Sequence, residues 1–235
     1  MRRSNIPLLS RLAWRNVWRN KRRTAIMLAA IGIGVWLMIF MAALMRGMVE
    51  QQVDDTIDNL TGHVQIHAPR YRDDPAIEHS MTSPDDRLRA VLDSDAVTQW
   101  AARVRLPAVV ASERETVGVS LVGMDPEAER GLSFIAEAVK QGRYLNGLDD
   151  DGLLIGKKLA ERLETDLGKR VVVMSQDAND EIADRGFKVV GIFEADMTET
   201  EERFVFTGRQ VVQRLLKMDG RISEISLRAQ NRNHL

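Results

Sequence analysis

Residues 24–45 read TAIMLAAIGIGVWLMIFMAALM, a run of 22 residues without a charged side chain. At about 1.5 Å rise per residue, this run forms a helix of roughly 33 Å, which is enough to cross a hydrocarbon core of about 30 Å. A cleaved signal peptide also combines a basic start with an apolar run, but its apolar part is usually about 7–15 residues long and an A-x-A site follows it. No such site follows here, so the run predicts an uncleaved transmembrane helix.

The charges on either side of this helix predict its orientation. Residues 1–23 contain eight Lys/Arg and no acid, whereas residues 46–235 contain 25 basic and 34 acidic residues. The net charge of −1 is therefore the sum of a basic N-terminal segment and an acidic C-terminal part. By the positive-inside rule, the N-terminus is cytoplasmic. We therefore expect a bacterial inner-membrane protein with a single span in this chain and its main domain in the periplasm.

The basic segment before the span has the pattern of an interfacial helix. On a helical wheel its arginines share one narrow face, while Trp and Leu fill much of the rest, and such a helix lies in the plane of the membrane surface. A basic flank without a preferred conformation is the alternative. We expect a sharp turn at Asn20-Lys21 into the span. The expected membrane-interface anchors are Arg11, Trp14, Arg15, Trp18, Arg19, Arg22 and Arg23.

Apolar residues continue beyond the span at three- and four-residue intervals, at Val49, Val53, Ile57 and Leu60. This spacing predicts that the helix extends as a stalk to about residue 60. The expected organisation is an interfacial helix over 1–23, a membrane span over 24–45, a stalk over 46–60 and an extracytoplasmic domain over 61–235.

The extracytoplasmic part interleaves short strands and short helices. We expect strands over 63–67, 102–112, 116–124, 153–155, 171–174, 187–193, 204–206 and 222–227, and helices over 83–92, 131–145 (with a break near Gly142), 157–163 and 211–218. In the first of these helices, Ser83 is the expected N-cap, Pro84 the first helical residue and Asp86 the capping-box acid. This mixture predicts the α+β class, in two small lobes.

The sequence offers little for catalysis. Residues 152–158 (GLLIGKK) resemble a phosphate-binding loop, but three residues instead of four separate the glycines and lysine replaces the Ser/Thr. His63 and His67 share a face of a strand but lie roughly 13 Å apart, so we expect exposed histidines and not a metal site. The chain has no cysteine and its large domain is acidic, which argues against thiolate chemistry and nucleic-acid binding. We predict no enzyme activity, catalytic residue, cofactor or metal.

Several phrases, in this order and spacing, resemble the first half of an ABC-transporter permease of the MacB/FtsX-like family. They lie at residues 12–24 (LAWRNVWRNKRRT), 62–66 (GHVQI), 122–126 (VGMDP), 154–160 (LIGKKLA), 167–171 (LGKRV), 187–193 (FKVVGIF) and 204–207 (FVFT), followed by the helix at 211–216. Within that family, these segments resemble most the lipoprotein-releasing permeases LolC and LolE. The resemblance implies a porter-like lobe with a second lobe inserted in it.

The same resemblance implies partners. They are a cytoplasmic ABC ATPase encoded separately, a second permease subunit in a homo- or heterodimer, the lipid bilayer, and a lipoprotein or other amphiphile that is released or exported. Division-linked members of the family signal to a periplasmic partner, so a membrane-anchored regulator or adaptor of the FtsX type stays an alternative. No second apolar run precedes residue 235, and we expect either a fragment that lacks the later membrane helices or the product of a truncated gene.

Overall fold

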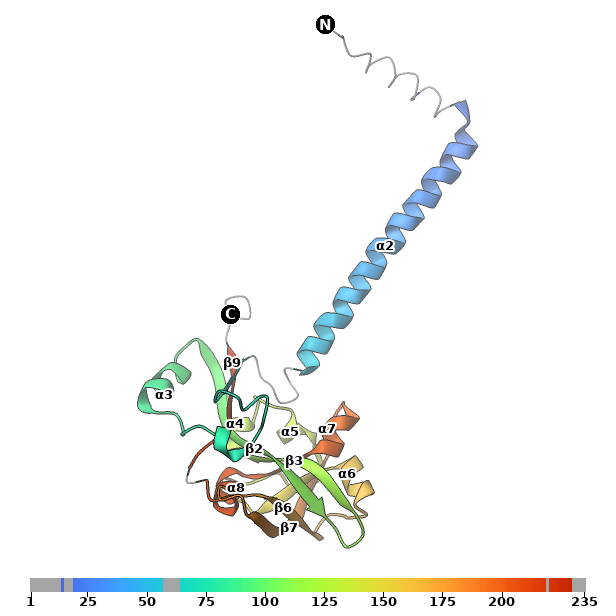
Figure 1. The fold of residues 1–235 in the computed structure, drawn as a ribbon. Helices are drawn as coiled ribbons and strands as arrows, with labels where there is room; N and C mark the ends of the chain where they lie inside the picture. Colours follow the sequence, from blue (N-terminus) through green and yellow to red (C-terminus); the bar gives the residue numbers. More distant parts are fainter. Residues whose placement is uncertain (1–13, 15–18, 57–63, 219, 230–235) are drawn as a thin grey trace. The chain divides into compact units, whose positions relative to one another are not determined.

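The computed structural model describes residues 14, 19–56, 64–218 and 220–229 (Figure 1). The chain divides into two compact units, Met1–Asp54 and Asp55–Leu235. The first unit is dominated by helix α2, which runs without interruption from Lys21 to Thr56, over 36 residues. Asn20, directly before it, lies in a turn. The helix therefore continues well past the apolar run, and the remaining predicted stalk residues 57–60 lie outside the described part of the chain.

The second unit mixes strands with short helices, as the sequence predicts. Its strands are β1 (Val64–His67), β2 (Val97–Ala111), β3 (Thr116–Met124), β4 (Val139–Gly142), β5 (Gly152–Gly156), β6 (Arg170–Gln176), β7 (Ile182–Phe193), β8 (Phe204–Gly208) and β9 (Glu224–Ala229). Its helices are η2 (Ile77–His79), α3 (Asp86–Leu92), α4 (Pro126–Glu129), α5 (Ile135–Ala138), α6 (Lys157–Arg162), α7 (Thr198–Arg203) and α8 (Arg209–Leu215).

Strand β2 belongs to two sheets. Its first half, Val97 to Arg103, pairs with β9, which pairs in turn with the edge strand β1. From Val104 onwards β2 pairs with β3 on one side and, near its end, with β6 on the other. The pairings β3·β8, β8·β5, β5·β7 and β7·β6 then complete a closed ring of six strands. Closing the ring leaves these strands without a free edge.

Each sheet has its own hydrophobic core, so the domain has two lobes. The small sheet β1-β9-β2 packs Leu92 of α3 against Ala102, Ile222 and Ile225. The largest core cluster takes alternate residues from the ring strands, among them Val104 and Leu106 of β2. In chain order the ring is inserted between the first half of β2 and β9. The predicted α+β class, with a second lobe inserted in the first, is confirmed.

Two local predictions are wrong. The N-cap of α3 is Asp85, whose carboxylate accepts the Leu88 N–H at 2.8 Å, whereas the Ser83 hydroxyl donates to the Gly220 carbonyl at 2.6 Å. The predicted helix over 131–145 is a single turn, α5, which is followed by strand β4 on the edge of β7. In both cases a contact with a segment distant in sequence overrides the local signal.

Candidate functional site

Between Lys21 and Met48 the surface of α2 is mostly apolar and uncovered. The segment Lys21–Met48 is long and apolar enough to cross a membrane, and no part of its most apolar window is buried against the described residues. Trp36 and Phe40, one turn apart, stack with their ring centroids at 5.6 Å. A helix that is apolar all round requires an apolar environment, so this surface fits lipid or other membrane helices.

The structure describes four of the seven predicted interface anchors. All four are exposed and lie at or before the start of α2: Trp14 (69% exposed), Arg19, Arg22 and Arg23. Arg11, Arg15 and Trp18 lie outside the described residues. Of the predicted stalk positions, Val49 and Val53 lie in α2, while Ile57 and Leu60 lie outside the described residues. The roles of these residues stay predictions.

A buried ion network lies where β2 passes from one sheet to the other. The guanidinium of Arg103 contacts Glu129 of α4 with two bonds, Nε to Oε1 at 2.5 Å and Nη2 to Oε2 at 2.8 Å. Its Nη1 reaches Glu224 Oε1 at 3.3 Å and Ser226 Oγ at 3.0 Å, both on β9. The side chains of the three charged residues are only 1–2% exposed. The carboxylates raise the pKa of Arg103 against the opposing effect of burial, so it stays charged.

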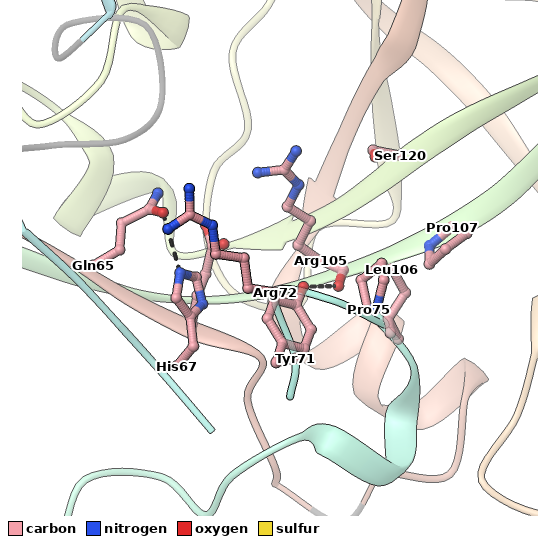
Figure 2. Close-up of a pocket in the computed structure, with 10 residues that line it drawn as sticks. Gln65, His67, Tyr71, Arg72, Pro75, Arg105, Leu106, Pro107 and Ser120 are labelled. Carbon is pink, nitrogen blue, oxygen red and sulfur yellow. Dashed lines mark hydrogen bonds between the residues drawn. The ribbon is translucent and has the colours of Figure 1, made fainter. Parts of the chain in front are cut away.

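A cleft of about 570 Å³ lies beside this network, between the two lobes (Figure 2). Its walls come from β1, from the second half of β2, from β3 and β9, and from the loop after β1. Gln65, His67 and Glu224 belong to the small sheet, whereas Arg105 and Ser120 belong to the ring. The cleft therefore collects polar side chains from both lobes.

Tyr71 forms one wall of the cleft and is almost completely buried. Its hydroxyl donates to the Arg105 carbonyl, and its ring stacks on the His67 imidazole with centroids 5.3 Å apart. Burial, together with the charge of Glu224, raises the pKa of Tyr71 to about 12. The prediction of an exposed His67 is thus wrong, because the residue is half-buried between the strand and this tyrosine.

Three atoms around the cleft are buried without a hydrogen-bond partner among the described residues. They are Gln65 Nε2, His67 Nδ1 and Glu224 Oε2. A buried polar atom without a partner costs roughly 1–3 kcal/mol, and most such atoms in proteins are paired. All three atoms are enclosed by neighbouring side chains, so they are not open to a molecule in the cleft. The cleft is the candidate site because it collects polar side chains from both lobes.

The loop that resembles a phosphate-binding motif is occupied by protein contacts. Lys157 Nζ binds Glu194 at 3.0 Å and Lys158 Nζ binds Glu161 at 2.9 Å. A Cβ at Gly156 would lie 2.2 Å from the backbone oxygen of Glu201, so the glycine is there because the backbones approach closely. Nor do the described residues contain a group of three or more His, Cys, Asp or Glu that could hold a metal ion.

Comparison with known proteins identifies the family. The family described as MacB-like periplasmic core domain matches residues 24–234, which include most of α2 and all the described strands. This chain belongs to that family. It is a mixed α+β periplasmic domain of the MacB type, preceded by an apolar helix long enough to span a membrane. No match is found among curated proteins.

The solved structures that are similar to this MacB-type chain include three domains of transporters or permeases. The extracellular domain of the noncanonical ABC-type transporter YknZ from Gram-positive bacteria is 17% identical, with 71% of this chain and 82% of that chain covered and a TM-score of 0.49. The periplasmic region of MacB from Actinobacillus actinomycetemcomitans is 12% identical, with 71% and 73% covered and a TM-score of 0.48. A domain of a putative permease protein from Porphyromonas gingivalis is 17% identical, with 58% of each covered and a TM-score of 0.38.

Sequence reasoning missed the cleft in this MacB-type domain entirely. Its residues come from segments as far apart as Gln65 and Glu224, and no local motif joins them. One signal was available, because Arg103 and Glu224 are charged residues within otherwise strand-like runs. A charge that falls on the buried face of a strand requires a partner, but the sequence does not say which residue supplies it.

Proposed function

We propose that this chain is the membrane and periplasmic part of an ABC-transporter permease subunit that releases or exports lipoproteins or other amphiphiles. In this proposal a cytoplasmic ATPase supplies the motion, and the chain passes it through the membrane to the periplasmic domain. The N-terminus is cytoplasmic, and a second permease subunit completes a homo- or heterodimer. Membership of the MacB-like family supports the transporter class.

The length of α2 is the observation that supports transmission of motion from the membrane to the periplasmic domain. Its 36 residues make a rigid rod of about 54 Å, whereas the hydrocarbon core of a bilayer is about 30 Å thick. One helix therefore serves as membrane span and as stalk without a hinge between them. A continuous helix transmits a displacement from one end to the other, which a flexible linker would absorb.

The test is to interrupt the stalk and leave the span intact. Proline at Val53 removes a backbone hydrogen bond and costs about 3 kcal/mol in a helix interior, whereas alanine at the same position keeps the helix. We reconstitute the full-length permease and its ATPase in proteoliposomes. We then measure ATP hydrolysis and the transfer of a lipoprotein to a soluble acceptor.

We expect Val53→Pro to keep membrane insertion and ATP hydrolysis but to lower lipoprotein release at least about tenfold, with Val53→Ala close to wild type. Unchanged release in the proline variant would contradict the role of the stalk. Co-purification tests the cargo. If the chain captures a cell-wall hydrolase or its activator and no lipoprotein, the regulator of the FtsX type replaces the transporter.

A further inference from the structure

We propose that the cleft between the two lobes binds a singly charged oxyanion, a carboxylate or a phosphodiester, through the guanidinium groups of Arg105 and Arg72. The proposal concerns ligand binding by the periplasmic domain. It does not depend on the transport function above, because it can be tested without the ATPase or a lipoprotein. The observation that supports it is the environment of Arg105.

Five arginines of the described residues are buried or half-buried, and Arg105 differs from the other four. Each of those four donates to an oxygen atom of the protein: Arg103, Arg185, Arg209 and Arg228. The Arg105 guanidinium has no such acceptor within the described part of the chain, and its nitrogen atoms are not enclosed. A half-buried cation has lost part of its water, so an oxyanion in the cleft would supply the missing acceptors.

The fold brings a second arginine to Arg105. The Arg105 guanidinium lies 4.9 Å from the centre of the Phe204 ring, at a cation–π distance that holds it in place. The Arg105 carbonyl accepts the hydrogen bond of the Tyr71 hydroxyl, which attaches the loop after β1 to β2. Arg72 follows Tyr71 directly, lines the same cleft and likewise has no oxygen acceptor among the described residues. In Figure 2 both guanidinium groups lie on the same side of the cleft.

The charges around the cleft favour a single negative charge on the ligand. Arg72 and Arg105 contribute two positive charges to its lining. The buried network behind them, Arg103 with Glu129 and Glu224, has one net negative charge. One positive charge is therefore left uncompensated, in a domain with more acidic than basic residues. A singly charged oxyanion balances it, whereas a doubly charged phosphate would add negative charge next to Glu224.

The remaining walls suit a small ligand with an apolar part. Ser120 on β3 lines the cleft, and its hydroxyl, which has no partner among the described residues, can donate to an oxyanion. The exposed rings of Pro75 and Pro107 line it as well and offer apolar contact. The volume of about 570 Å³ is in the range of small-ligand sites. A small amphiphilic anion therefore fits the cleft better than a neutral molecule, which would leave Arg105 without an anion.

The test measures binding to the full-length chain in phosphatidylcholine nanodiscs, by equilibrium dialysis of radiolabelled probes with the signal of empty nanodiscs subtracted. The probes are hexanoate, dibutyl phosphate as a singly charged phosphodiester, and hexanamide, which has the shape of hexanoate without its charge. Arg105→Met removes the guanidinium and keeps an unbranched side chain against Phe204. Arg72→Glu reverses the other charge, and Arg170→Glu, at an exposed position of β6 outside the lining of the cleft, is its matched control.

We expect hexanoate or dibutyl phosphate to saturate the wild type with a Kd of about 1 mM or below, at least about tenfold tighter than hexanamide. The tighter of the two anions identifies the source of the oxyanion, a carboxylate or a phosphodiester such as a lipid headgroup. Arg105→Met and Arg72→Glu should each weaken binding at least about tenfold, and Arg170→Glu less than about twofold. Without ligand, Arg105→Met should unfold within about 4 °C of the wild type, because no oxygen atom of the described residues loses its donor.

The proposal is overturned if hexanamide binds as tightly as both anions, if neither anion saturates the wild type up to about 10 mM, or if a folded Arg105→Met variant retains full affinity. If Arg105→Met does not fold, Arg72→Glu decides, since it changes an exposed loop residue. Wild-type affinity in Arg72→Glu, or an equal loss in Arg170→Glu, then contradicts the proposal. These outcomes leave the stalk experiment unaffected.

Discussion

Substitution of Arg103 by methionine is the sharpest test of how the two lobes are held together. Arg103 on β2 binds Glu129 with two hydrogen bonds and Glu224 and Ser226 through Nη1. Methionine fills a similar volume but leaves two carboxylates, each about 1% exposed, without their cation. Removing one partner of a buried ion pair typically costs about 3–5 kcal/mol.

We therefore expect Arg103→Met to lower the free energy of unfolding by about 4 kcal/mol, which is a large part of the roughly 5–15 kcal/mol of a typical domain. Arg103→Lys keeps the charge but cannot form the two-bond contact with Glu129, so its loss should be smaller, about 1.5–3 kcal/mol. The assay is urea unfolding of the full-length chain in detergent, followed by circular dichroism. All variants are compared at the same pH.

Two comparisons separate buried charge from general damage. Arg114→Met removes an arginine that also pairs with a glutamate, Glu164, but at 70% and 53% exposure, and should cost at most about 1 kcal/mol. Adding Glu129→Gln and Glu224→Gln to Arg103→Met removes both buried charges and should recover a large part of the loss. A loss below about 1 kcal/mol for Arg103→Met, or one equal to that of Arg114→Met, would refute the reasoning.

Three further predictions concern titration and packing. Burial and a nearby carboxylate raise the pKa of Tyr71 to about 12, and burial raises that of Tyr144, the other tyrosine of the chain. At about pH 11 the folded protein should therefore show at most about a tenth of the tyrosinate absorbance of the unfolded protein, and its stability should fall as the pH rises above about 10; a larger absorbance from the folded protein would disprove the burial argument. Burial raises the pKa of Asp150, but hydrogen bonds from an arginine and two backbone N–H groups outweigh this effect and lower it. Asp150→Asn should cost about 1–3 kcal/mol at pH 7, and the difference should shrink as the pH falls below about 4, because the wild type then loses the same contribution; a deficit that does not change with pH would contradict it. Gly156→Ala should cost at least about 2 kcal/mol in thermal unfolding because its Cβ would meet backbone atoms, whereas Gly118→Ala, with open space around it, should stay within about 0.5 kcal/mol of wild type.

Most elements of the fold could be predicted from local patterns. The runs at residues 116–124 and 187–193 are rich in valine and other apolar residues, and both occur in the structure as parts of β3 and β7. Helix α7 was missed because Thr198–Arg203 is polar throughout and has no apolar periodicity. Tertiary contacts hold this helix in place, because the Glu201 carboxylate accepts hydrogen bonds from the backbone N–H groups of Lys158 and Ala195.

The cleft between the two lobes could not be predicted in the same way. Gln65 and His67 sit two residues apart on a strand and read as ordinary surface residues. They line a cleft only because the loop after β1 places Tyr71 against His67 and because β9 brings Glu224 next to them. The packing that buries their polar atoms involves segments more than 100 residues apart.

The sequence by itself determined the apolar span, the asymmetry of charge about it and the α+β character of the domain, because these depend on composition and on periodicity within a few residues. Only the tertiary structure decided that β2 serves two sheets, that six strands close into a ring, and that Arg103 is buried between two glutamates. The physical reason is that strand pairing and the pairing of buried charges join segments that are far apart in the sequence. Each depends on which distant strand or carboxylate lies nearby in the folded chain, and a local pattern of residues does not predict this.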